Sequence, residues 1–310
     1  MKIYHGLEEF KSIKNPVVTV GTFDGVHLGH HQIFKRMKRI AKECDGETLV
    51  VTFHPHPRLV LHPDSKNLKF INTQERKYQL IEDAGIDYLI IIPFTRDFAS
   101  NDARTFIKDI LYDKIGICQL VVGHDHHFGR NREGSFNELL LLAKELDFKV
   151  EQIPVQDIDN IAISSTKIRN ALNRGEIKTA NTLLGYEYSI TGKVVGGNKI
   201  GHRIGFPTAN IELDDKYKLI TANGVYACRI QWKDKKYLGM GNIGFRPTIN
   251  RSKLTIEVHI FDFDEDIYND TITIFFVDRI RDEVKFRDLD ALQQQLVRDK
   301  ITVLGLLQAH

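Results

Sequence analysis

The sequence predicts two domains: an α/β domain built on a doubly wound parallel sheet, and an antiparallel β-barrel that ends in a helix. Up to about residue 185, short apolar runs alternate with helical patterns, whereas after about residue 186 closely spaced β-rich runs follow one another. With 310 residues, the chain is long for one hydrophobic core and comfortable for two. We therefore expect one domain over residues 1–185 and another over residues 186–310.

The first half carries the elements of a parallel sheet. Strands are predicted from apolar runs at Val17–Gly21, Thr48–Phe53, Tyr88–Ile92, Gln119–Gly123 and Lys149–Ile153. Helical patterns lie between them, at residues 30–43, 73–84, 102–113 and 135–146. Asn72, followed three residues later by Glu75, is a capping arrangement that predicts where the second helix begins. A parallel, doubly wound sheet binds ligands beyond the C-terminal ends of its strands.

The second half carries short strands separated by turns rich in glycine, asparagine and aspartate. Strands are predicted at Tyr188–Val195, Val225–Trp232, Lys236–Gly241, Leu254–Phe261 and Thr271–Val277. A terminal helix is expected over Leu289–Leu307, and residues 170–188 contain a short helical junction. This spacing favours an antiparallel sheet or small barrel.

Composition excludes several classes of protein. The formal net charge is +2, so no global field attracts nucleic acid or an anionic membrane surface, and we expect neither as a partner. The three cysteines include no Cys-x-x-Cys pair, which argues against a disulfide framework or a zinc ribbon. The N-terminus lacks an apolar signal core, and the longest apolar run is far too short to span a bilayer. A reduced, cytoplasmic location is the expectation.

The stretch GTFDGVHLGH, residues 21–30, directly follows the first predicted strand. Gly21 and Gly25 allow a tight turn and a close approach of the backbone to a ligand. The helix that follows would direct unpaired N–H groups at an anion, and His27 and His30 share one helical face from which they can donate to phosphate oxygens. The alternative is a strand–helix turn with partly exposed histidines. The order G-x-G-x-x-G of dinucleotide-binding loops is absent.

Three further stretches contain residue types that bind phosphates or metals. Ser164, Ser165 and Thr166 can cap a helix, or together with Arg169 they can bind a triphosphate. The histidine-rich segments at 54–57 and 124–127 do not predict a dedicated metal site, because no H-E-x-x-H pattern accompanies them.

The second glycine-rich stretch, GGNKIGHRIGFPTANI, spans residues 196–211. It is either a flexible hairpin with a proline turn, or a mobile loop over nucleotide phosphates. In the second case Thr208 and Asn210 offer oxygen ligands to Mg²⁺. Glu257 alternates with Ile256 and Val258, so it points away from them, either into solvent or toward chemistry.

The motifs of the first half resemble a known family. F-D-G-x-H-x-G-H at 23–30 resembles the His-x-Gly-His signature of nucleotidylyltransferases. With TFHPHP (52–57), VGHDHHFG (122–129) and ISSTKIR (163–169), it resembles the Rossmann-like adenylyltransferase domain of bacterial bifunctional riboflavin kinase/FAD synthetases. The resemblance implies that His27 and His30 stabilise charge on the phosphates. It also implies a nucleotide-binding set of Gly21, Phe23, Asp24, Gly25, Asp125, Ser164, Ser165, Thr166 and Arg169. The flavin-binding set that it implies is Phe53, His56, Pro57 and Phe128. The sequence departs from the family at His126, where phenylalanine is usual.

The motifs of the second half resemble riboflavin kinases. G-F-P-T-A-N (205–210), GVYA (224–227), GNIGFRPTI (241–249) and IEVHIFDFDEDIY (256–268) occur in the family's order. The resemblance implies that Glu257 acts as base toward the ribityl hydroxyl. It also implies that Gly201, Thr208 and Asn210 bind the nucleotide, the last two with Mg²⁺. Arg246, assigned to flavin binding, either contacts a ligand phosphate or holds the turn, and His202 departs from the arginine common in the family.

Together these resemblances imply a bifunctional enzyme of flavin cofactor biosynthesis. The C-terminal domain would phosphorylate riboflavin to FMN, and the N-terminal domain would join FMN to the AMP part of a second ATP, giving FAD and pyrophosphate. The implied ligands are ATP, riboflavin, FMN and FAD, with Mg²⁺ in both steps. Two alternatives remain at this point: an enzyme that retains one of the two activities, and a regulatory protein that binds flavin or nucleotide without turnover.

Overall fold

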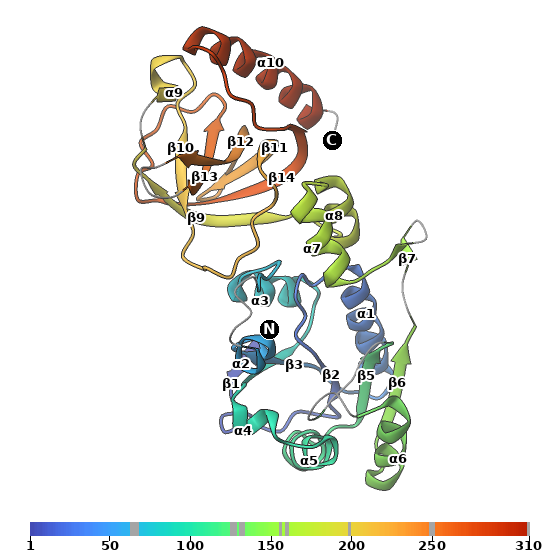
Figure 1. Ribbon diagram of the computed structural model, residues 1–310. Helices are drawn as coiled ribbons and strands as arrows, with labels where there is room; N and C mark the ends of the chain where they lie inside the picture. The colour runs from blue at the N-terminus through green and yellow to red at the C-terminus, as the bar shows by residue number, and fades with distance from the viewer. Residues whose placement is uncertain are drawn as a thin grey trace. The chain divides into compact units, whose positions relative to one another are not determined.

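The structure, a computed structural model, describes residues 1–62, 68–124, 129, 134–154, 157–158, 161–197, 200–247 and 252–308. The chain forms two compact units, Met1–Ser164 and Ser165–His310, called here the N-terminal and C-terminal units (Figure 1). Helices α7 (Ser165–Arg174) and α8 (Ile177–Leu184) belong to the C-terminal unit. The amide of Asn181 on α8 donates to the carbonyl oxygen of Phe276 at 2.8 Å, which fastens α8 to the barrel. The domain ranges 1–185 and 186–310 stay predictions.

The N-terminal unit contains the expected parallel sheet, which confirms the predicted fold. Its strand order is β1-β4-β3-β2-β5-β6, and every pair is parallel. The strands are β1 (Lys2–His5), β2 (Val17–Val20), β3 (Thr48–His54), β4 (Tyr88–Pro93), β5 (Gln119–Gly123) and β6 (Lys149–Ile153). Strand β1 was not predicted. A short hairpin, β7 (Asp157–Ile158) and β8 (Ile161–Ala162), follows the sheet.

Helices cover both faces of this sheet (Figure 1). They are α1 (Leu28–Glu43), α2 (Pro57–Leu61), α3 (Gln74–Asp83), α4 (Arg96–Ala99), α5 (Ala103–Thr105), the π-helix η1 (Phe106–Lys114) and α6 (Phe136–Leu146). One face packs its apolar residues against η1 and α6, and α1 packs against β2, β3 and β5. Helix α3 begins after Thr73, whose hydroxyl accepts from the backbone N–H of Arg76 at 3.3 Å. The predicted cap at Asn72 is therefore wrong by one residue.

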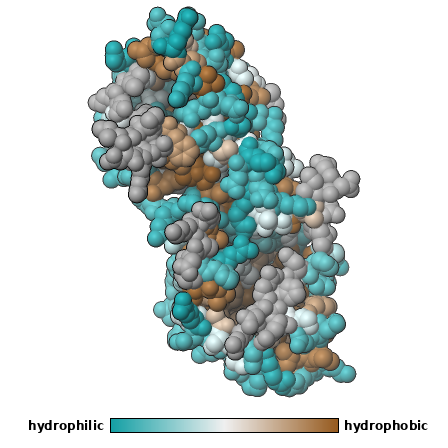
Figure 2. All heavy atoms as spheres, in the orientation of Figure 1, coloured by the Kyte–Doolittle hydropathy of each residue, from teal (hydrophilic) through white to brown (hydrophobic). Residues whose placement is uncertain are grey.

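Helix α6 shows how a run of leucines is divided between core and surface. Leu139 and Leu142 are buried, whereas Leu140 and Leu141 are 43% and 70% exposed. The buried pair is separated by three residues and so lies on one face of the helix. In Figure 2 the hydrophobic surface at the lower right of the view lies over α6. Among the described helices, none combines the length and apolar character needed to cross a membrane.

The C-terminal unit is a closed antiparallel barrel, as expected, with the order β10-β13-β12-β11-β14-β9. The strands are β9 (Ser189–Val195), β10 (Ala209–Glu212), β11 (Gly224–Trp232), β12 (Lys235–Pro247), β13 (Ser252–Ile260) and β14 (Thr271–Arg281). Strand β9 pairs with both β10 and β14 and so closes the barrel. The short helix α9 (Ile200–Arg203) precedes β10, which was not predicted.

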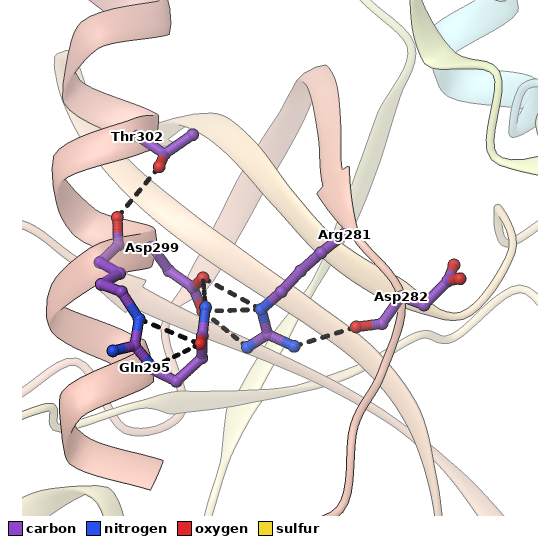
Figure 3. Close-up of polar contacts among 6 residues, drawn as sticks. Arg281, Asp282, Gln295, Asp299 and Thr302 are labelled. Atoms are coloured by element: carbon purple, nitrogen blue, oxygen red, sulfur yellow. Dashed lines mark hydrogen bonds and ion pairs between the residues drawn. The ribbon is translucent and has the colours of Figure 1, made fainter. Parts of the chain in front are cut away.

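The terminal helix α10 (Leu289–Gln308) packs across β11, β12 and β14 and is fastened by a buried ion pair (Figure 3). The Nε of Arg281, at the end of β14, donates to both carboxylate oxygens of Asp299 at 3.0 Å, and its Nη2 donates to Oδ2 at 2.6 Å. Gln295 donates to the same carboxylate at 2.8 Å. The side chain of Asp299 is 4% exposed and that of Arg281 is 20% exposed. The anchor therefore joins the last strand of the barrel to the middle of the helix.

Candidate functional site

The stretch GTFDGVHLGH lies at the point where the strand order of the parallel sheet reverses. From β2, the strands β3, β4 and β1 extend to one side, and β5 and β6 extend to the other. Gly21 directly follows β2, and Gly123 ends its neighbour β5. In open α/β sheets, ligands bind in the crevice outside the carboxyl ends of the strands at such a switch point. The topology therefore places this stretch where a ligand is expected.

The loop between β2 and α1 has a strained backbone. Phe23, Gly25 and Val26 have φ angles of +49°, +89° and +36°. A positive φ is an outlier for a β-branched residue such as valine and costs on the order of 1–3 kcal/mol. Phe23 and Val26 are nevertheless buried, with 4% and 0% of their surfaces exposed. Strain of this kind persists only where the surroundings hold it, and it is typical of ligand-binding sites.

The structure brings the two predicted histidines into direct contact. The rings of His27 and His30 stack with centroids 3.7 Å apart and planes inclined by 15°. The backbone N–H of His27 donates to Nδ1 of His30 at 3.2 Å. Because Nδ1 accepts this bond, a neutral His30 carries its proton on Nε2. The His30 ring is thus prepared to donate one hydrogen bond from Nε2.

Gly29 leaves room for this stack. A Cβ atom at position 29 would lie 3.2 Å from Cε1 and Nδ1 of His27. That distance is too short for ordinary packing, so any other residue would press on the ring. The glycine between the histidines therefore has a steric role beside the helix start.

The environment keeps His30 neutral. Burial is the largest cause that lowers its pKa well below the usual value, and repulsion from its basic neighbours His27, His31 and Lys77, each when protonated, lowers it further. Burial likewise lowers the pKa of His31. At neutral pH these imidazoles act as uncharged hydrogen-bonding groups rather than as fixed cations.

The predicted flavin-binding segment begins at Phe53 on β3, the direct neighbour of β2 in the sheet, and continues beyond the end of that strand. The ring of Phe53 lies 5.5 Å from that of Phe94 and 5.8 Å from that of Phe98, so it belongs to an aromatic cluster. His56 stacks on Phe70 at 4.5 Å and precedes Pro57, the first residue of α2. The sheet thus places this segment at the same edge as the histidine loop.

Several predicted residues are described only in part. Asp125 and Phe128, like His126, lie outside the described residues, and Arg246 is described only as a backbone position on β12. Asp24 is buried and accepts from the backbone N–H of Ile71 at 2.9 Å.

The serine-rich motif spans the division between the two units. Ser164 immediately precedes α7, and Ser165, Thr166 and Arg169 lie on that helix. The preceding residue, Ile163, belongs to the N-terminal unit, where its Cγ2 lies 3.9 Å from the Cβ position of Gly29. The chain therefore passes the histidine loop before it enters α7. Phosphate binding by the motif stays a prediction.

In the C-terminal unit, Glu257 lies on β13 between the buried residues Ile256 and Val258, and its own side chain is half-buried. It stands opposite Asn210 on β10 and Asn242 on β12. The hydroxyl of Thr208 donates to Oε2 of Glu257 at 3.3 Å. Three residues predicted separately are therefore brought together: Glu257 on β13, Asn210 on β10, and Thr208 in the loop just before β10.

His259 was not predicted, although it lies two residues after Glu257. Its ring nitrogen Nδ1 donates to the carbonyl oxygen of Pro207 at 2.7 Å, since a carbonyl can only accept. The ring packs edge-on against Phe206 and Phe261. Strand β13 thus holds two consecutive loop residues, Pro207 through His259 and Thr208 through Glu257.

Gly201 has a packing role of its own. The backbone carbonyl of Gly201 accepts from the N–H of Phe206 at 2.8 Å, and a Cβ at position 201 would lie 2.1 Å from the carbonyl oxygen of Phe206. No side chain fits there, so the turn between α9 and β10 requires glycine. Nucleotide binding by Gly201 stays a prediction.

The chain is similar to known enzymes over nearly its whole length. A family model for FAD synthetase matches residues 9–167, and one for riboflavin kinase matches residues 184–307. A bifunctional riboflavin kinase/FMN adenylyltransferase from Buchnera aphidicola subsp. Acyrthosiphon pisum is 37% identical over 100% of this chain and 99% of that protein. The chain belongs to the family of bifunctional riboflavin kinase/FMN adenylyltransferases.

Other known proteins match the chain at similar identity. The bifunctional enzyme of Escherichia coli K12 is 33% identical over 97% of this chain and 96% of its own length. A crystal structure of a protein named macrolide-efflux protein, from Streptococcus pneumoniae, matches with a TM-score of 0.89 and 31% identity. It covers 98% of this chain and 99% of its own. The shared fold thus extends over both units.

Proposed function

We propose that the two activities of the family are divided between the two units, with the histidine loop and Glu257 as their centres. The enzyme phosphorylates riboflavin to FMN and adenylylates FMN to FAD. The observation that carries the division is the contact between the proposed central side chains in each unit: His27 stacks on His30 beyond β2, and Thr208 and Asn210 meet Glu257 at the barrel. ATP is abundant in the cytoplasm, which supports the cytoplasmic location that we propose.

Adenylyl transfer in the N-terminal unit is a displacement at the α-phosphorus of ATP. A phosphate oxygen of FMN forms the new P–O bond, the bond to the β-phosphate breaks, and pyrophosphate leaves with that electron pair. The Nε2–H of His30 donates to the phosphate oxygens, on which negative charge builds. The N-terminus of α1 adds its positive dipole end. No covalent enzyme intermediate is needed.

Phosphoryl transfer in the C-terminal unit moves the γ-phosphoryl group of ATP to the terminal ribityl hydroxyl of riboflavin. The carboxylate of Glu257 accepts the hydroxyl proton as the new P–O bond forms, and ADP leaves with the electrons of the broken bond. Most of the rate comes from positioning and electrostatics. The bond from Thr208 orients the carboxylate, while His259 holds the adjacent Pro207 carbonyl.

The donor set of the barrel site fits Mg²⁺. The hydroxyl of Thr208 and the side-chain amide oxygen of Asn210 are hard oxygen ligands of the kind that this ion prefers. Among the described residues, no group of three or more His, Cys, Asp or Glu side chains could hold a metal. A site of this kind relies on substrate phosphates to complete the coordination. Bound Mg²⁺ would neutralise charge on the ATP phosphates.

The test measures both products in one assay. Purified protein is incubated with riboflavin, ATP and Mg²⁺, and the flavins are separated by chromatography. Both FMN and FAD should form; FMN alone would indicate a single retained activity, and neither product would indicate a binding protein.

Two substitutions test the division of labour. Glu257→Gln should abolish FMN formation and leave FAD formation from supplied FMN intact, and His30→Ala should do the reverse. Glu265→Gln, on an exposed turn, and His31→Ala, on the same helix turn, serve as matched controls. Equal loss of both products in either test variant would refute the assignment.

A further inference from the structure

A buried lysine lies beneath the histidine loop. Lys77, on α3, is only 6% exposed. Its ammonium group donates to the backbone carbonyl of Thr22 at 3.3 Å and to the hydroxyl of Thr52 at 3.2 Å. Thr22 belongs to the loop after β2, and Thr52 lies on β3. One charged group therefore joins the ends of two neighbouring strands at the edge where the ligand is expected.

Lysine is rarely buried unless its ammonium group is paired or hydrogen-bonded, because removing an ammonium from water is costly. Burial lowers the pKa of Lys77 to about 8, although the nearby carboxylate of Asp24 acts in the opposite direction. The side chain thus remains mainly protonated at neutral pH, with two oxygen acceptors in place of water. Because the Lys77 side chain is buried, it does not act as a surface charge.

Helix α3 and the turn before it hold the loop at two points. The carboxylate of Asp24, in the middle of the loop, accepts from the backbone N–H groups of Ile71 and Asn72 at 2.9 and 3.5 Å. Lys77 holds the Thr22 carbonyl two residues earlier. Phe23 lies between Thr22 and Asp24, and Val26 lies two residues after Asp24. Both have positive φ angles, which require support from their surroundings. The segment 71–77 supplies that support.

We propose that Lys77 is a positioning residue for adenylyl transfer, whose buried ammonium holds the Thr22 carbonyl and thereby fixes the strained loop that presents His27 and His30. This inference rests on the proposed function of that loop. A second effect follows from charge. The ionisable groups that face Lys77 are Asp24 from the loop, His30 from α1 and Tyr78 from its own helix. Its positive charge opposes protonation of His30, which favours the neutral, Nε2-protonated ring.

The experiment compares Lys77→Met with Lys77→Arg in the full-length enzyme. Methionine keeps the bulk of the side chain and removes its donors and charge, whereas arginine keeps both. Lys38→Met is the matched control. The ammonium of Lys38, on α1, also donates to a backbone carbonyl, that of Ala84 at the C-terminal end of α3, at 2.6 Å. FAD formation from FMN, FMN formation from riboflavin, and thermal melting are measured for each.

Lys77→Met should lower kcat for FAD formation by about tenfold or more, with a smaller change in the KM for FMN, because the reacting geometry is disturbed more than binding. Lys77→Arg should recover a large part of kcat, and FMN formation should be unchanged in both. The acid limb of the kcat profile should move to higher pH in Lys77→Met, since His30 loses a neighbouring positive charge.

Several outcomes would overturn the inference. Unchanged FAD formation in a folded Lys77→Met protein would do so, as would equal losses in Lys77→Met and Lys77→Arg, or an equal loss in the Lys38→Met control. His30→Ala is measured in parallel. If that variant retains FAD formation, the proposed site itself is wrong; if it loses FAD formation while Lys77→Met does not, only the role of Lys77 fails.

Discussion

Replacing Asp299 by alanine is expected to destabilise the C-terminal unit by about 3 kcal/mol. The carboxylate accepts three bonds from Arg281 and one from Gln295, and its side chain is 4% exposed. Removing one partner of a buried pair costs roughly 3–5 kcal/mol, because the other charge stays buried. The lower end applies, since Arg281 is 20% exposed and also donates to the carbonyl of Asp282.

The two activities report separately on the two units, so they show whether the loss of stability is confined to the C-terminal unit. For a unit of this size, about 3 kcal/mol corresponds to a fall of about 10 °C in the melting midpoint. Kinase activity should be lost at the lower temperature, while adenylyl transfer in the same chain keeps its wild-type inactivation profile. High salt should change the difference little, because the pair is largely shielded from solvent.

A double variant tests the reasoning further. Asp299→Ala combined with Arg281→Met removes both charges, so it should cost less than the sum of the two single changes. A loss below about 1 kcal/mol for Asp299→Ala, or strict additivity in the double variant, would refute the account of the anchor.

Two more predictions concern the sites. Gly29→Ala should lower FAD formation several-fold and spare FMN formation, because its Cβ would lie 3.2 Å from the His27 ring; an unchanged rate in the two-product assay would contradict the packing argument. Burial lowers the pKa of His259, so the unfolded chain takes up a proton more readily than the folded one. The stability contributed by neutral His259 should be complete above about pH 6.5 and should decline below it. The temperature at which kinase activity is lost, measured between pH 5 and 7, tests this prediction. In His259→Gln that temperature should depend less on pH.

Burial on both faces made strand β2 predictable from the sequence. All four residues of β2 are buried, as in a strand covered on both faces, and all but Thr19 are apolar. Strand β1 buries only Tyr4, and β10 fully buries only Ile211, so neither shows an apolar run of useful length. Such short strands are defined by their neighbours, which pair with them through the backbone.

The candidate sites were predictable only as far as local spacing allows. The helical period places His27 and His30 on one face, and alternation along β13 separates Glu257 from its buried neighbours. Lys77 was missed because a lysine in a helical pattern is normally on the surface, and its partners lie far away in the sequence. His259 was missed because its acceptor, the carbonyl of Pro207, has no signature in the side-chain pattern.

The pairing of β9 with β14 has a consequence for biogenesis. Ile190 stands opposite Ile274, so the barrel cannot close until its final strand has been translated. Every strand of the parallel sheet lies before residue 154, and domains generally fold as units as they leave the ribosome. The nascent enzyme therefore matures in the order opposite to its chemistry: the unit for the second reaction is assembled first, and the kinase that supplies it is assembled last.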